Sequence, residues 1–320
     1  MRVNRWFLYA GVFLITIGGV TVAAEAGALG TATLTDILRL WPLAVIALGA
    51  GLVLKRSRYS LPGGLAAVLV PGLVAGSAFA ILPRFVGDCG ARSEPVAVAT
   101  ERGAFVGPAS VSVRTGCGGL NLRTAPGNGW QLDAGNSLGR APSVEASGES
   151  LAIRSTAGHG WDALGGGRDR WDLALPAGEI EALTLVANAN RSHLDLAGAR
   201  IGALAVTGNA AEVVVDATSA SVAELSAVMN TGLLSIHLPA ASSLAGSIRL
   251  GGGQVQVCAP PGVGVLITTR GFGRQIVVDG VDQDGSSWQS SNYESAALRA
   301  DLDVRVSFGT IDINPIGGCT

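Results

Sequence analysis

The chain has 320 residues, of which 48% are apolar and 14% charged, and its formal net charge at pH 7 is -2. This balance argues against a nucleic-acid partner, because proteins that bind nucleic acids usually carry a strongly basic surface. Apolar residues are concentrated before residue 83, and the remainder is rich in Gly, Ala, Ser and Asn. The composition therefore indicates two parts of different kind and excludes one uniform globular domain.

Three apolar segments in the first part predict transmembrane helices. Residues 6–24 and 61–82 carry no charge, and each approaches the length of about 20 residues that crosses a bilayer. Between them lies a shorter segment, 37–54, in which Arg39 can extend its charged end toward the interface. We expect an N-terminal α-helical bundle of three spans within a transmembrane domain over residues 1–87. A cleavable signal peptide is the alternative for the first segment.

Basic residues predict the orientation of these spans. Arg2 and Arg5 precede the first span, and Lys55, Arg56 and Arg58 lie between the second and the third. Because basic loops remain in the cytoplasm, we expect the N-terminus there and the C-terminal part on the other side. A re-entrant middle segment would reverse this arrangement and violate the rule. The sequence thus predicts a multi-pass membrane protein, with the lipid bilayer as a partner.

A polar linker over residues 88–98 is expected to lead into an extracytoplasmic β-domain over residues 99–320. Strand-like alternation begins there without a clear repeat, in VSVRT, GLNLRT, WQLDA and SLAIRS. Trp171 stands 21 residues before Ser192 and so matches the repeat that follows, whereas Leu151 and Ile153 are out of step with it. The residues between them predict an inserted loop.

A 21-residue repeat then runs through five copies, from Ile180 to about Asp284. Its apolar positions stay in register, and one column contains Leu194, Val215, Ile236, Val257 and Val278. Alternation within a copy predicts short strands, and identity between copies predicts parallel stacking at about 4.8 Å. One copy cannot bury its own apolar face, but a stack forms a continuous core. The predicted fold is therefore an all-β parallel β-solenoid with rungs of about 21 residues.

Alternation returns near the end of the chain. Its apolar positions are Leu302, Val304, Val306, Ile311 and Ile313. We expect these strands to cap the last rung, because an uncapped solenoid exposes an edge that recruits other chains.

One outward-facing row combines residue types that bind metals. Stepping by 21 residues connects Asp195, Asp216, His237 and Cys258, which should lie at rung spacing. Carboxylate, imidazole and thiolate groups are all metal ligands, so the row is a candidate metal site. The simpler interpretation is that polar residues are ordinary on the outside of a solenoid, and we expect neither a metal nor another cofactor.

A second polar row is expected to be structural. It consists of Asn188, Asn209 and Asn230, each at the end of the first strand of its copy. Asparagine favours turns, so this row predicts a ladder of turn residues.

All four cysteines follow the last predicted span: Cys89, Cys117, Cys258 and Cys319. This distribution suits an oxidising compartment and predicts disulfides, although free thiols are an alternative. Cys258 should point out of the stack, where the flexible tail can reach it. We therefore favour Cys258 with Cys319 and Cys89 with Cys117, and a bond between Cys89 and Cys319 is the main alternative.

Residues 6–54 resemble the LiaI/LiaF-like transmembrane region of bacterial envelope-stress proteins, with Gly18 and Gly19 ending one apolar run and LWPLAVIALGAGLVL closing the unit. The β part resembles the adhesin-like, or toast-rack, β-solenoid domain through GCGGLNLRT, the stacked rungs and the terminal YESAALRADLDVRVSFGTIDI. The resemblance implies a membrane-anchored, non-catalytic sensing or interaction module of the cell-envelope stress response. It also implies another membrane or envelope protein, such as a sensor kinase, as a partner.

Catalytic motifs are missing from the sequence: it has no phosphate-binding loop ending in Gly-Lys-Ser/Thr, no HExxH and no GxSxG. We therefore predict that the protein is not an enzyme. A polysaccharide lyase would need clustered acids and bases. A structural or adhesive β-solenoid that self-associates or binds envelope polysaccharide is the alternative function. In the inserted loop, Arg168, Asp169 and Arg170 could contact an anionic polymer, and a solvated loop is the simpler interpretation.

Overall fold

The computed structural model divides the chain into two compact units, residues 1–87 and 88–320. It describes residues 5–26, 28–29, 33, 36–37, 40–54, 63–65, 67–77, 94–156, 167–271, 274–278, 281–284 and 286–314. Structural statements below concern these residues, and each unit is considered by itself.

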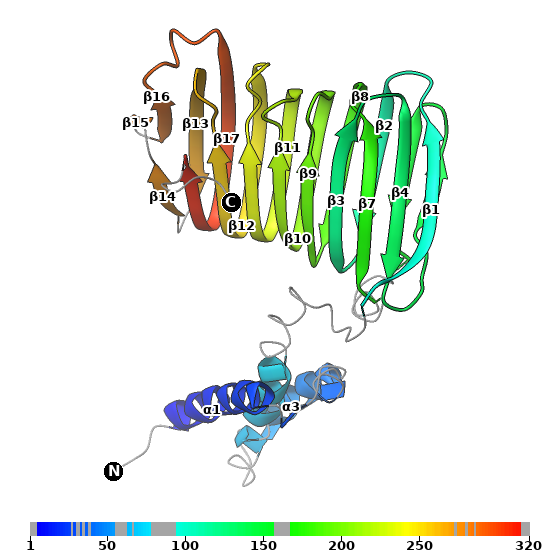
Figure 1. Cartoon of the computed structure of the whole chain (residues 1–320). Helices are drawn as coiled ribbons and strands as arrows, with labels where there is room; N and C mark the ends of the chain where they lie inside the picture. The colour runs from blue at the N-terminus through cyan, green and yellow to red at the C-terminus, as the bar shows by residue number, and fades with distance from the viewer. Residues whose placement is uncertain are drawn as a thin grey trace. The chain divides into compact units, whose positions relative to one another are not determined.

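The first unit is helical. It contains α1 (Arg5–Glu25) and α3 (Trp41–Leu54), shown in blue in Figure 1. Pro42 is the second residue of α3, where its missing N–H breaks no intrahelical hydrogen bond. Large apolar side chains are exposed on both helices, among them Leu14, Ile15, Val22, Ile46 and Val53.

The three-span transmembrane bundle predicted for this unit is wrong. Within the described part of the chain, no helix combines the length and the apolar character that a membrane crossing needs. The second predicted span, 37–54, contains α3, whose 14 residues rise about 21 Å and fall short of a hydrocarbon core about 30 Å thick. The predicted span begins at residue 37, whereas α3 begins at Trp41. The predicted multi-pass membrane localisation depended on the same spans and is overturned with them.

The second unit is built from strands, which Figure 1 shows side by side along a stack. Their bounds are β1 (Val96–Ala104), β2 (Ala109–Thr115), β3 (Gly118–Ala125), β4 (Gly129–Asn136), β5 (Ser143–Ala146), β6 (Ser150–Arg154), β7 (Asp169–Pro176), β8 (Glu179–Asn188), β9 (Asn190–Asp195), β10 (Arg200–Asp216), β11 (Ser221–His237), β12 (Leu244–Cys258), β13 (Val263–Gly271), β14 (Arg274–Val278), β15 (Val281–Asp284), β16 (Ser287–Ser290) and β17 (Leu298–Ile313).

The middle of the stack follows the 21-residue repeat. A rung consists of two strand halves separated by a corner: β8 and β9 form one rung, and β10, β11 and β12 each form one by themselves. Neighbouring rungs pair in parallel, so that Leu204 lies opposite both Leu183 and Leu225. Ile236 likewise lies opposite both Val215 and Val257. The predicted register is confirmed from β8 to β12.

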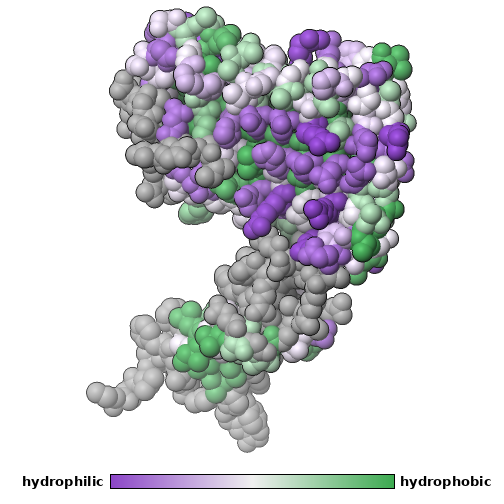
Figure 2. All heavy atoms as spheres, viewed as in Figure 1, coloured by the Kyte–Doolittle hydropathy of each residue, from purple (hydrophilic) through white to green (hydrophobic). Residues whose placement is uncertain are grey.

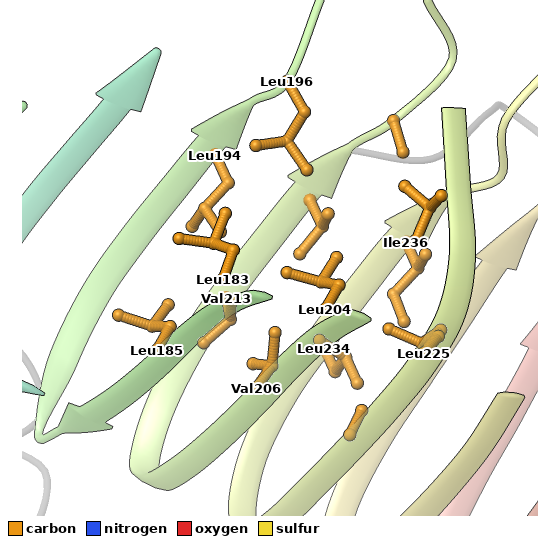
Figure 3. Packing of buried hydrophobic residues seen from close by; sticks show 14 of the residues in the cluster. Leu183, Leu185, Leu194, Leu196, Leu204, Val206, Val213, Leu225, Leu234 and Ile236 are labelled. Carbon is orange, nitrogen blue, oxygen red and sulfur yellow. The ribbon is translucent and has the colours of Figure 1, made fainter. Parts of the chain in front are cut away.

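Alternating residues of these rungs point into one core. Figure 3 shows the resulting columns, in which like residues of successive rungs stack on one another. Leu183, Val213 and Val215 are fully buried, and Ile236 is 2% exposed. Burying one such side chain contributes about 1.5–3 kcal/mol, so the repeat of apolar positions along the sequence is also what stabilises the stack.

Both ends of the stack depart from the order of the chain. At one end, β2 and β3 form a rung between β8–β9 and β6–β7: Val111 lies opposite Leu183 and Leu151. At the other end, β17 lies between β12 and β13–β14, so that Val304 is opposite both Ile248 and Thr269. In Figure 1, the red β17 accordingly stands among yellow and orange strands.

These insertions correct three predictions. Val257 is adjacent to Ile313 and not to Val278, because β17 separates the fourth and fifth copies of the repeat. Trp171 lies opposite Leu120, because β3 separates β7 from β9. The last strand is an internal rung and not a terminal cap. A strand in an internal position pairs along both edges, which a terminal cap cannot do.

The ends of the stack are closed by antiparallel strands, so the predicted all-parallel solenoid is wrong as a description of the whole unit. At one end β4 pairs antiparallel with β7, β1 with β4 and β5 with β6. At the other, β16 pairs antiparallel with β13 and with β15. Short turns connect antiparallel neighbours more easily than parallel ones, and the sheet is therefore mixed.

Candidate functional site

The predicted metal row is assembled as neighbours, but its acidic members serve as turn residues. Asp195, Asp216, His237 and Cys258 lie opposite one another on successive rungs. Oδ1 of Asp195 accepts a hydrogen bond from the backbone N–H of Ala197 at 3.1 Å. Asp216 accepts the equivalent bond from Thr218 at 2.9 Å. Such bonds to a residue two positions on are typical of Asx turns.

The environment of Asp216 fits this structural role. Burial on its own would raise the pKa of this carboxyl, but hydrogen bonds from Thr218 and the nearby His237 and His193 outweigh it and hold the pKa below its ordinary value. The charged form is therefore the one that closes the turn. In the part of the chain that the structure describes, no group of three or more His, Cys, Asp or Glu side chains is placed to hold a metal ion.

Neither Cys117 nor Cys258 is a free thiol. They cannot be bonded to each other, because they lie four rungs apart, which is roughly 19 Å at strand spacing, whereas a disulfide needs Cα atoms within about 7 Å. Cys89 and Cys319 lie outside the described residues. Each predicted pair joins one described cysteine to one of these two, so the pairing stays a prediction.

The asparagine row forms the expected ladder. Asn209 Nδ2 donates to Asn188 Oδ1 at 2.8 Å, and Asn230 Nδ2 donates to Asn209 Oδ1. Asn188 Nδ2 in turn donates to the backbone oxygen of Thr115 at 2.9 Å, which continues the ladder onto the inserted rung. The prediction of a structural turn ladder is confirmed.

Two of the residues proposed to contact an anionic polymer, Arg168 and Asp169, bind other residues of the protein instead. Asp169 is 4% exposed and accepts hydrogen bonds from Asn136 Nδ2 at 2.8 Å and Ser155 Oγ at 2.7 Å. Burial raises the pKa of this carboxyl, and these hydrogen bonds only partly oppose it. Arg168 pairs with Glu94 at 3.1 Å. Asp169 therefore stabilises the end of the stack, and loop residues 157–166 lie outside the described part.

One regular surface is the outer face of the first strand halves, which we call the first-strand face. It extends over β6, β2, β8, the first halves of β10, β11, β12 and β17, and β13. Eight strands at strand spacing span about 34 Å. One of its columns consists almost entirely of small or short side chains: Ala152, Ser112, Thr184, Ala205, Ser226, Ser247, Asp303 and Thr268. This column makes the face flat.

The neighbouring column is basic at both ends. It consists of Arg154, Arg114, Val186, Thr207, Val228, Arg249, Arg305 and Arg270. Three arginines stand on adjacent strands at one end, where they border a hollow of about 660 Å³. Figure 2 shows that hydrophilic side chains are also abundant on the visible face of this unit.

The sequence analysis did not predict this arginine cluster, although the 21-residue repeat connects two of its three members. Arg249 and Arg270 are 21 residues apart and so occupy one column of the repeat. Arg305 enters between them only because β17 is inserted there. No period in the sequence connects residue 305 with the other two.

No family model matches this chain, and no curated protein matches it. The LiaI/LiaF-like resemblance is therefore not supported by a family match. Among solved structures, a proposed cell-adhesion protein from Clostridium sporogenes is 16% identical over 69% of this chain and 99% of its own length, with a TM-score of 0.44. A proposed adhesin from Bacteroides fragilis is 10% identical over 67% and 96% of the two chains, with a TM-score of 0.30.

A proposed adhesin from Parabacteroides distasonis is 11% identical over 70% of this chain and 98% of its own, also with a TM-score of 0.30. The descriptions of all three name adhesion. TM-scores this low carry no argument about what the chain does, so function has to be argued from its own residues.

Proposed function

We propose that the β unit is a non-catalytic adhesive module that binds an extended envelope polysaccharide along its first-strand face. The observation that carries the proposal is the flat column of small side chains across eight strands. Ser and Thr hydroxyls there, such as those of Ser112, Thr184 and Ser226, can both donate and accept hydrogen bonds. A polymer of repeating units can make the same contact on successive rungs, whereas a small substrate would need an enclosed pocket.

Self-association through the ends of the stack is the less favoured form of adhesion. Among the described strands, β1 pairs only with β4 and is an edge. It carries the exposed Glu101 and Arg102 and an irregularity between Ala97 and Ala99. Charges and bulges on an edge strand discourage pairing with another chain. The other edge at this end, β5, is only four residues long.

A stress-sensing role with a sensor kinase as partner was expected from the transmembrane resemblance. The three-span bundle behind that expectation is contradicted, so the adhesive alternative is preferred. A protein partner in the envelope stays a prediction.

Sedimentation with insoluble polysaccharide prepared from bacterial envelopes tests the proposal. The full chain should sediment with the polysaccharide. Ser226→Trp should reduce the bound fraction at least fivefold, because a large ring would stand above the flat column. Asn121→Trp is the matched control, since Asn121 is exposed on β3, outside the first-strand face. Absence of sedimentation by the unmodified chain, or equal losses in both variants, would contradict polysaccharide binding along this face.

A further inference from the structure

Three arginines stand side by side at one end of the first-strand face. Arg305 on β17 lies opposite Arg249 on β12 and opposite Arg270 on β13. All three are exposed. Neighbouring strands are about 4.8 Å apart, and like charges directly opposite each other destabilise a sheet. Because a guanidinium group does not lose its proton in proteins, the repulsion cannot be relieved by titration.

The protein supplies little negative charge to compensate this row. Asp303 Oδ2 accepts a hydrogen bond from Arg305 Nη2 at 3.0 Å. The next acid along β17, Asp301, is engaged by the Tyr293 hydroxyl at 2.6 Å, which together with burial raises the pKa of that phenol. In the described structure, Arg249 and Arg270 have no ion pair. One carboxylate therefore faces three cations.

The hollow beside the arginines exists because the asparagine ladder ends there. Asn230 is its last member, and the next rung has Gly251 in that place. A Cβ at Gly251 would lie 2.5 Å from the backbone oxygen of Asn230, so no side chain fits. The resulting hollow of about 660 Å³ is also lined by Ser307 and Phe308. Phe308 is 71% exposed and offers an apolar ring at its rim.

We propose that Arg249, Arg270 and Arg305 bind the carboxylate groups of an acidic polysaccharide, with one sugar unit seated in the hollow beside them. This inference rests on the proposed function and specifies the ligand as a polymer that carries repeated carboxylates. Arginine's planar fork of donors matches a carboxylate bidentately, and such charge-assisted bonds are about twice as strong as neutral ones. Asn230, Ser307 and Phe308 provide polar and apolar contacts for the sugar ring.

Affinity measurements on the full chain test the site, with polygalacturonate, dextran and polyphosphate as probes. Polygalacturonate should bind the unmodified chain, and the binding should weaken as salt is added. The double variant Arg249→Ala with Arg270→Ala should raise the Kd for polygalacturonate at least tenfold. Arg305 is left in place because it pairs with Asp303. The matched control is Arg102→Ala with Arg123→Ala, which removes two exposed arginines from β1 and β3 and changes the net charge equally.

The outcomes separate this inference from the proposed function. A tenfold loss confined to the arginine pair of the hollow supports the site. Equal losses in both double variants, or tighter binding of polyphosphate than of polygalacturonate, overturn a carboxylate site. If the chain sediments with envelope polysaccharide but polygalacturonate does not bind, adhesion stands and the arginine site is wrong. If neither polysaccharide binds, the proposed function itself fails.

Discussion

The middle rungs of the β unit and the rungs at its two ends are built in different ways. From β8 to β12 each rung is the next segment of the chain, so partners such as Leu204 and Leu225 are 21 residues apart. At the ends, partners come from distant segments: Val111 pairs with Leu183, and Ile248 pairs with Val304. Closing such long loops costs more chain entropy than stacking consecutive rungs. In return, both inserted rungs are paired along both edges.

This difference has a consequence for function. The repeat alone would produce a uniform face, and the flat column on the middle rungs is uniform in this sense. The insertion of β17 places Arg305 between Arg249 and Arg270 and so concentrates charge at one end of the same face. The middle rungs thus provide the extended surface, and the inserted rung provides its distinctive chemistry.

The largest expected effect compares a buried charge in the two regions. Ile236→Asp places a carboxylate between Val215 and Val257 without a partner, and should cost about 4 kcal/mol of the free energy of unfolding. Ile311→Asp in β17 buries the same charge between Val255 and Ile276. Here we expect local opening of β17 together with β13 and β14, because these strands lie at one end of the stack and can separate from β12 while the middle rungs remain paired.

Hydrogen exchange and chemical denaturation distinguish these responses. In Ile311→Asp, amides of β10 and β11 should keep their protection, whereas in Ile236→Asp they should lose it. Ser226→Asp, at an exposed position of β11, is the control and should change stability by less than about 0.5 kcal/mol. Unaltered stability of Ile236→Asp would show that the 21-residue register is wrong.

The next effect concerns the corners of the rungs. Gly232 has a φ of 128°, and a Cβ there would lie 1.9 Å from the backbone oxygen of Ala211 on the preceding rung. Gly232→Ala should therefore destabilise the unit by about 3 kcal/mol, because backbone strain and the steric clash both contribute. Gly127, in a turn near one end, has a φ of 113° but open space around it. Gly127→Ala should cost only about 1 kcal/mol.

Thermal unfolding of the two glycine variants sharpens the comparison of middle and end. A larger loss for Gly127→Ala than for Gly232→Ala would mean that close stacking of the rungs does not determine the corner residue.

The asparagine ladder offers a smaller effect within the middle rungs. Asn209 both donates to Asn188 and accepts from Asn230, so Asn209→Ala removes two hydrogen bonds. We expect a loss of about 2 kcal/mol. Asn230→Ala ends the ladder one rung earlier and removes one bond, for a loss of about 1 kcal/mol. Denaturant titration gives both values, and equal losses would argue that the ladder does not act as a chain.

The sequence predicts the middle of the stack because its information is local and periodic. Alternating burial sets which residues face inward, and the spacing of 21 sets which of them meet, as Leu194, Val215, Ile236 and Val257 do. The insertions at the ends have no such signal, because the apolar pattern of β17 suits a cap and an internal rung equally well. Choosing between them depends on long-range pairing free energy, which no local pattern contains.

The helical unit and the candidate site show the same limit. Hydropathy identified the apolar segments around α1 and α3, but it did not place the start of α3 at Trp41. The polar rows were placed correctly by the repeat, but the repeat did not predict that Oδ1 of Asp195 and of Asp216 each closes a turn. The arginine cluster could not be predicted without knowing that β17 is inserted between β12 and β13.

The smallest expected effect is a pH dependence at an end rung. Burial raises the pKa of Asp169 above its ordinary value of 3.8, so the folded state binds this proton more tightly than the unfolded state does. Stability from this group is therefore present below that value and is lost as the pH rises through the raised pKa. Asp169→Asn should remove this loss, so that the variant's stability changes less with pH above 3.8 than that of the unmodified chain.

The variant should still fold, because the Ser155 hydroxyl can accept as well as donate and the amide keeps one oxygen for Asn136. Urea denaturation at a series of pH values measures the slope. Asp172→Asn, at an exposed position three residues further along β7, is the control and should keep the slope of the unmodified chain. An unchanged slope in Asp169→Asn would mean that the buried carboxyl at the end of the stack does not set its response to pH, and that the two regions of the unit differ in connectivity alone.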